Sequence, residues 1–334
     1  MARTAILPLA LAGALALAGC STSAPAATDD SVQIVASTNV YGSIAEAIGG
    51  DKVTVTSLIT SAAQDPHSYE ASAQDQLALS KADLVIENGG GYDPFIDTLL
   101  EAAQSDAVVL NASEASGLLE GDDHAHTDDE HAEEESDTET GEGDDHAQEI
   151  EEGHEGHDHI EGFNEHVWYS LHGIGHVAEE LSHELAEIDP DNAAGYAANY
   201  EAFAAEIETL EGTAEALHTE TEGHGVAITE PVPLYLLEAA GFSNVTPEAF
   251  SEAIEEGTDV APATLRDTLD LFSSNAVSLL AYNSQTASTE TEQVREAAEA
   301  AGVPVVEFTE TLPDGADYVS WMTDNLSAIS AALG

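Results

Sequence analysis

The sequence predicts an α/β protein of two lobes, each a parallel sheet flanked by helices, joined by one long linker helix. Three observations lead to this fold class. Short β-branched apolar runs alternate with helical patterns over residues 32–110, and the same alternation returns over residues 225–334. Between the two regions lies a long helical pattern rich in Ala and Glu. Strands that alternate with helices indicate βαβ units around a parallel sheet, so each alternating region is expected to form a lobe.

The individual elements follow from the apolar runs and their boundaries. In the first region we expect strands at residues 32–36, 53–59, 83–87 and 107–110, and helices near residues 42–48, 73–80 and 93–103. In the second region we expect strands at residues 225–228, 277–281 and 305–308, and helices near 232–240, after Ala261, at 289–301 and from about Asp317.

The connection between the lobes is predicted to be helical. Residues 174–186 and 192–217 carry apolar residues at helical spacing, broken at Asp189-Pro190-Asp191. Asp191 is expected to cap the second helix, because its carboxylate can accept hydrogen bonds from first-turn amides. A helix of about 26 residues would run roughly 39 Å, which is long enough to cross between lobes. We therefore expect an N-terminal lobe at residues 32–190, a linker helix at 191–222 and a C-terminal lobe at 223–334.

The N-terminus has the layout of a secretory signal. Arg3 precedes an uncharged apolar run over residues 5–18, which is too short to span a membrane as a stable helix. The run closes on Leu17-Ala18-Gly19-Cys20, which resembles a bacterial lipobox, and Cys20 is the only cysteine, so no intramolecular disulfide can form. We expect a signal peptide at residues 1–19, a lipid on Cys20 and a tether at residues 20–31. The protein would then be exported and lipid-anchored to the outer face of the cell membrane; a chance cysteine after an ordinary signal is the alternative.

The charge balance restricts the partners. Five basic residues stand against 66 acidic ones, and the formal net charge is −61. Such a surface repels nucleic acid and anionic lipid headgroups and attracts cations. A nucleic-acid partner is therefore excluded.

Residues 120–161 form an acidic, histidine-rich loop. Seven of the 14 histidines lie there among twenty carboxylates, without a single lysine or arginine. These histidines are His124, His126, His131, His146, His154, His157 and His159. Neutral imidazole suits zinc, copper and nickel, so the loop is predicted to capture metal; a solvated acidic linker is the alternative. A segment this poor in apolar residues cannot form a core, so the specific site must lie elsewhere.

Other histidines stand at positions suited to such a site. His67 follows the strand expected to end near residue 59, where ligands of open α/β sheets bind, and His166 stands where order should resume after the acidic loop. His172 and His176 are four residues apart, a spacing that on a helix puts both on one face. That pair is either a polar helix surface or a secondary zinc site. The remaining histidines outside the loop are interpreted as surface residues, because no family motif surrounds them; they are His183, His218 and His224.

Several motifs resemble those of one family. They are Gln64-Asp-Pro-His-Ser-Tyr-Glu, Ala82-Asp-Leu-Val-Ile-Glu-Asn-Gly, Asn164-Glu-His-Val-Trp, Asp189-Pro-Asp-Asn-Ala and the region of Tyr318, Trp321 and Met322. In order and spacing the chain resembles the solute-binding lipoproteins of zinc and manganese ABC importers, in which a rigid helix joins two lobes. The resemblance implies a metal site in the interlobe cleft.

The resemblance also implies the ligands. The histidines of the Asp-Pro-His and Asn-x-His-x-Trp motifs carry over to His67 and His166. The third ligand, His in most zinc members and often Glu in manganese members, falls on Glu230, and the fourth falls on Glu310. A set with two carboxylates is a harder ligand set than one with three histidines, and it suits Mn(II) or Fe(II). The histidine-rich loop and the order of divalent affinities favour Zn(II) instead.

The expected function is therefore metal delivery without catalysis. The protein would act as a monomer, capture Zn(II) as the transported ligand and pass it to an ABC permease with its ATPase. The alternatives are a Mn(II) or Fe(II) importer protein and a surface zinc-storage protein or adhesin. A secreted metallohydrolase is disfavoured, because the chain has no H-E-x-x-H and no G-x-S-x-G motif.

Overall fold

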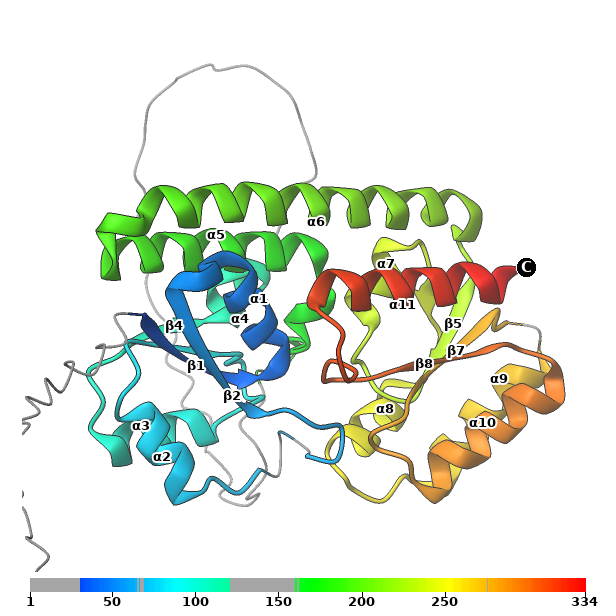
Figure 1. Ribbon diagram of the computed structural model, residues 1–334. Helices are drawn as coiled ribbons and strands as arrows, with labels where there is room; N and C mark the ends of the chain where they lie inside the picture. The colour runs from blue at the N-terminus through cyan, green and yellow to red at the C-terminus, as the bar shows by residue number, and fades with distance from the viewer. Residues whose placement is uncertain (1–30, 65, 67–68, 121–159, 161, 275) are drawn as a thin grey trace, which may run out of the picture. The chain divides into compact units, whose positions relative to one another are not determined.

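Two four-stranded parallel sheets, one in each lobe, form the framework (Figure 1). The computed structural model describes residues 31–64, 66, 69–120, 160, 162–274 and 276–334. The first sheet contains β1 (Val32–Thr38), β2 (Val53–Ile59), β3 (Leu84–Glu87) and β4 (Val108–Asn111). The second contains β5 (Gly225–Ile228), β6 (Ser243–Asn244), β7 (Leu279–Asn283) and β8 (Val305–Phe308). The spatial orders β2-β1-β3-β4 and β6-β5-β7-β8 are equivalent, so the lobes share one topology.

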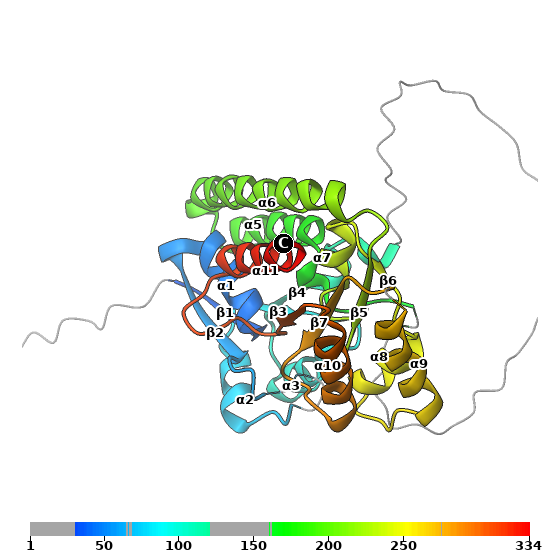
Figure 2. The same cartoon turned by 90° about the vertical axis from the view of Figure 1, so that its right-hand side faces the viewer.

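Helices cover both sheets and confirm the predicted α/β alternation. The N-terminal lobe carries α1 (Asn39–Gly49), α2 (Ala73–Leu79), α3 (Phe95–Ala103), α4 (Ala112–Ala115) and α5 (Leu171–Ile188). The C-terminal lobe carries α7 (Leu234–Ala239), α8 (Glu248–Glu255), α9 (Pro262–Ser273), α10 (Thr289–Ala301) and α11 (Tyr318–Leu333). Figure 2 shows the same elements from the side, with α2 and α3 below the first sheet and α8, α9 and α10 below the second.

The apolar core has one large cluster and two smaller ones. The large cluster joins the inner strand faces to the helical layer and includes Ile34, Trp168, Tyr196 and Trp321. The other face of each sheet has its own cluster, one around Val85 and one around Leu280. Both faces of each sheet are thus covered, which explains why the central strands are almost continuously apolar.

The long helix α6 (Ala193–Thr221) confirms the predicted helical connection. It packs on α1 and α5 in the first lobe and on α7 and α11 in the second (Figure 1). The expectation that Asp191 caps this helix is wrong: the N-cap residue is Asn192, and its side chain makes no capping bond. The carboxylate of Asp189 instead accepts from Asn192 Nδ2 at 2.7 Å and from the hydroxyl of Tyr196 at 2.8 Å. This ties the turn of η4 (Pro190–Asn192) to the helix that follows.

Among the α-helices and β-strands of the described residues, the short elements α4, β6 and α8 were not predicted. None of the described helices is both long and apolar enough to cross a membrane. Several predicted features lie outside the described residues: the signal peptide, Cys20, most of the tether, His67 and the seven loop histidines. The domain boundaries at residues 190, 191, 222 and 223 stay a prediction.

Candidate metal centre

A cavity of about 570 Å³ lies between the lobes, at the carboxyl ends of the parallel strands. Its lining includes His166 together with Glu230, Glu255, Gln285 and Glu310. Ligands of open α/β sheets bind at this edge, because the loops that leave neighbouring strands converge there. The cavity therefore brings together three of the four residues that the sequence singled out as ligands.

His166 is held by the residue two positions before it. Its side chain is 1% exposed, and η3 (Val167–Tyr169) follows directly. Asn164 Oδ1 accepts from the backbone N–H of His166 at 3.2 Å and lies 2.7 Å from His166 Nδ1. Because a backbone N–H must donate, this atom is the amide oxygen, and His166 Nδ1 must also donate to it. The neutral ring then keeps its lone pair on Nε2, as a metal ligand requires.

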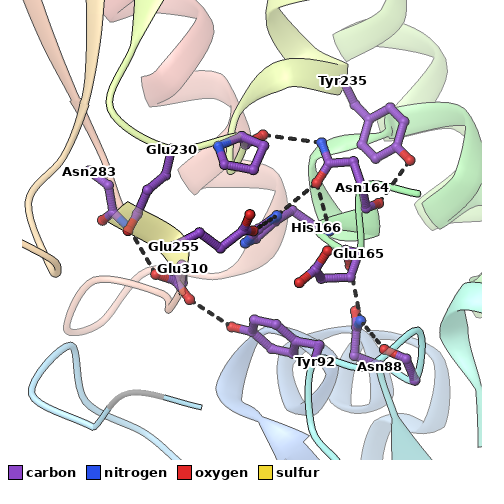
Figure 3. Close-up of polar contacts among 12 residues, drawn as sticks. Asn88, Tyr92, Asn164, Glu165, His166, Glu230, Tyr235, Glu255, Asn283 and Glu310 are labelled. Carbon is purple, nitrogen blue, oxygen red and sulfur yellow. Dashed lines mark hydrogen bonds and ion pairs between the residues drawn. The ribbon is translucent and has the colours of Figure 1, made fainter. Parts of the chain in front are cut away.

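The orientation of Asn164 is fixed in turn by the C-terminal lobe. The side-chain Nδ2 of Asn164 donates to the backbone carbonyl of Pro231 at 3.1 Å. The backbone carbonyl of Asn164 accepts from the hydroxyl of Tyr235 at 2.8 Å (Figure 3). The imidazole of His166 is therefore positioned by contacts to both lobes.

Glu230 and Glu310 lie close together because of the strand order. Each stands two residues beyond a strand, β5 and β8 respectively, and β7 runs between these strands. Asn283, the last residue of β7, donates from Nδ2 to Glu230 Oε2 and, at 2.9 Å, to Glu310 Oε1 (Figure 3). The two glutamates are 3% and 4% exposed, and Asn283 is 2% exposed. One buried amide thus bridges two buried carboxyl groups.

Tyr92 connects this pair to the N-terminal lobe. Its hydroxyl donates to Glu310 Oε2 at 3.1 Å, and its ring packs on Trp168 with centroids 4.7 Å apart. Tyr92 is placed by the turn after β3, where the carboxylate of Asp93 accepts from the amides of Asn88 at 2.7 Å and Gly89 at 2.8 Å. Burial raises the pKa of Asp93 to about 6, although these amide bonds oppose the shift.

Two further acids lie beside His166 and were not predicted as candidate ligands, and one of them, Glu255, lines the cavity. Glu165, His166 and Glu255 each offer an atom within 4.8 Å of the others, and Glu255 Oε1 is 3.8 Å from His166 Nδ1. Burial, followed by the neighbouring carboxyl groups, raises the pKa of Glu255 well above its usual range. Glu165 belonged to a motif already recognised, but no role was assigned to it. Glu255 ends α8, a helix of eight residues whose pattern is too short to stand out.

The fold and the cavity define a two-lobe binding protein whose site lies between its lobes and is rich in carboxyl groups. The chain belongs to the family of zinc-uptake complex component A (ZnuA), periplasmic, whose profile matches residues 34–332. The recognised class, a solute-binding protein of zinc and manganese ABC importers, is thereby confirmed.

Individual relatives agree with the family. The manganese-binding lipoprotein MntA of Halalkalibacterium halodurans is 28% identical over 239 residues, which cover 70% of this chain and 66% of that protein. The manganese ABC transporter substrate-binding lipoprotein ScaA of Streptococcus gordonii is 26% identical and covers 100% and 99% of the two chains. The periplasmic zinc-binding protein TroA of Treponema pallidum superposes with a TM-score of 0.68 at 17% identity, over 91% of this chain and 99% of that one. The last likeness concerns the fold alone.

Proposed function

We propose that this protein captures one Zn(II) ion in the cleft, on His67, His166, Glu230 and Glu310, and delivers it to an ABC permease. One observation carries the proposal: the buried carboxyl groups of Glu230 and Glu310, bridged by one amide, line the same cavity as an imidazole whose Nε2 keeps its lone pair. A buried pair of carboxyl groups is costly unless a proton or a cation offsets its charge. A divalent ion provides that compensation directly.

The donor set suits zinc. Zn(II) accepts imidazole nitrogen at about 2.0–2.1 Å and carboxylate oxygen at about 2.0–2.2 Å, and it binds N/O sites more tightly than manganese does. The contact of His166 Nδ1 with Asn164 supports a ligand role, since a partner on the second ring nitrogen fixes the orientation of metal-bound histidines. Ligands on both lobes would link metal occupancy to their relative position.

Mn(II) or Fe(II) is the second candidate, and the acids favour it. Glu230 stands where zinc members of the family usually have histidine, and the carboxyl groups of Glu165 and Glu255 lie beside His166. A set dominated by oxygen is hard and accommodates these ions readily. A surface zinc-storage protein or adhesin is the third candidate; it would share the site but not the delivery to a permease.

Competition titration of the metal-free mature protein tests the site and the metal together. We expect one zinc ion to bind far more tightly than manganese, and the tight site to be lost in His166→Ala. Glu230→His should then leave zinc affinity within about tenfold, the lower end of the effects seen when groups around a metal are changed. Glu256→His, which adds the same imidazole at the exposed rim of the cavity, is the matched control.

The possible outcomes separate the candidates. A tight site that survives in His166→Ala would mean that the ion binds elsewhere. Tight manganese binding that Glu230→His abolishes, while Glu256→His preserves it, would identify a manganese protein. Uptake of labelled metal by cells that carry or lack the permease then separates delivery from storage. Release of the protein from membranes by Cys20→Ser tests the proposed lipid anchor.

A further inference from the structure

We propose that His172 and His176 form a second transition-metal site on the exposed face of α5, separate from the cleft. Their Nε2 atoms lie 3.2 Å apart, and their rings meet edge-on at 85° with centroids 4.7 Å apart. The residues are one helical turn apart, so their side chains project from the same face. Both side chains are exposed, and neither lines the cavity that holds His166.

The distance between the two nitrogens matches the geometry of zinc. With Zn–N distances of about 2.0–2.1 Å and tetrahedral angles, two imidazole nitrogens on one ion are about 3.3–3.4 Å apart. The observed 3.2 Å therefore requires a movement of only a tenth or two of an ångström. The same distance also allows a hydrogen bond from one neutral imidazole to the other, which the ion would replace.

A carboxyl group lies behind one of the rings. Glu211 Oε1, on the neighbouring helix α6, is 3.8 Å from His172 Nδ1, the nitrogen that would not bind the metal. This distance is too long for a direct hydrogen bond but close enough for electrostatic attraction. A carboxylate behind a metal-bound imidazole raises its basicity and favours the orientation in which Nε2 faces the ion.

The surroundings supply negative charge and room for further ligands. His176 borders a surface cavity of about 380 Å³ that is also lined by glutamates of α4 and α5. These are Glu114, Glu179, Glu180 and Glu184. Two imidazoles in negatively charged surroundings suit Zn(II), Cu(II) or Ni(II) and should bind Mn(II) more weakly.

The pair also lies near one end of the histidine-rich stretch of sequence. Leu118 packs against the first turn of α5: its Cδ1 is 3.3 Å from the position that a Cβ on Gly173 would occupy. Gly173 directly follows His172 in the sequence. The chain enters the histidine-rich stretch at residue 120. The second site is therefore on the folded surface next to the entry to that stretch.

Zinc protection of individual histidines tests the proposal in the full mature chain. The protein is treated with diethyl pyrocarbonate at pH 7.5 with increasing zinc, and carbethoxylation of each histidine is measured by peptide mass spectrometry. We expect zinc to reduce the carbethoxylation of His172 and His176 by about tenfold or more. Both histidines should reach half of that reduction at the same zinc concentration. The exposed His224 should stay reactive and serves as the internal reference. Manganese should give no protection.

Variants separate chelation from indirect effects. In His172→Asn, protection of His176 should disappear, whereas in His183→Asn, which removes another exposed histidine of α5, it should remain. Protection should also remain in His166→Ala, because the cleft takes no part. The proposal is overturned if His176 stays protected in His172→Asn, if neither histidine is protected, or if protection appears only at zinc concentrations that also protect His224. Unchanged far-ultraviolet circular dichroism verifies that each variant folds.

Discussion

Asn283→Asp tests the link between the two cleft glutamates most directly. The substitution keeps the size of the side chain and the Oδ1 atom that accepts from the amide of Gln285 at 3.0 Å. It replaces the Nδ2 donor, which bonds both Glu230 and Glu310, with an oxygen of a third carboxyl group, which cannot donate when ionised. A hydrogen bond contributes about 0.5–1.5 kcal/mol, or about 1.5–3 kcal/mol when the acceptor is charged, so loss of two should lower the free energy of unfolding by roughly 1–6 kcal/mol. The free energy of unfolding of a folded domain is typically about 5–15 kcal/mol, so this loss would be readily measurable.

The loss should depend on pH in a defined direction. Burial and the two neighbours raise the pKa of the introduced carboxyl group in the folded state above its unfolded value of about 3.9. A carboxyl group whose pKa is raised in the folded state destabilises the fold once the pH exceeds the pKa of the unfolded state. The free energy of unfolding of the variant should therefore be closest to that of the wild type near pH 4 and furthest below it at pH 7.5.

Urea unfolding of the metal-free protein, followed by circular dichroism at both pH values, measures this effect. Asn244→Asp is the matched control, because Asn244 is an exposed residue of β6 whose Oδ1 accepts from the amide of Thr246 at 2.9 Å. It adds the same charge and should change stability by less than about 0.5 kcal/mol. A loss below about 1 kcal/mol for Asn283→Asp at pH 7.5, or a loss independent of pH, would refute the bridging role.

Three further predictions concern the same region. Tyr92→Phe removes the hydroxyl that donates to Glu310 across the lobes, and competition titration should show metal affinity reduced by about tenfold or more; unchanged affinity would contradict a positioning role. Burial, followed by nearby carboxyl groups, raises the pKa of Glu87 to about 7, so the stability of the wild type should fall as pH rises from about 4.5 to 7. Glu87→Gln should remove up to about 3 kcal/mol of that fall, measured by thermal unfolding at pH 5 and 8, and an identical pH profile would exclude this group as the cause. The indole of Trp168 lies 5.1 Å from the cleft imidazole between ring centroids, so metal should alter the emission of a Trp321→Phe protein but not that of Trp168→Phe.

The fold could be predicted where an element is long and its pattern regular. The buried strands β1, β3, β5 and β7 are short apolar runs, and α6 repeats an apolar spacing over 29 residues. The strand β6 has two exposed residues and α8 only eight residues, so neither carries enough periodicity to be distinguished from a loop. The capping assignment failed because Asp189, two positions before Asp191, already forms the side-chain contacts of that turn.

The sequence by itself determined the alternation of strands and helices, the helical connection and the placement of Glu230 and Glu310 just beyond strand ends. These properties depend on local residue patterns and on motifs. Only the tertiary structure decided that β7 lies between β5 and β8, so that Asn283 bridges both glutamates, and that Tyr92 reaches across from the other lobe. Such contacts join residues 27 to 218 positions apart, and they follow from strand order and lobe packing, which no local pattern encodes.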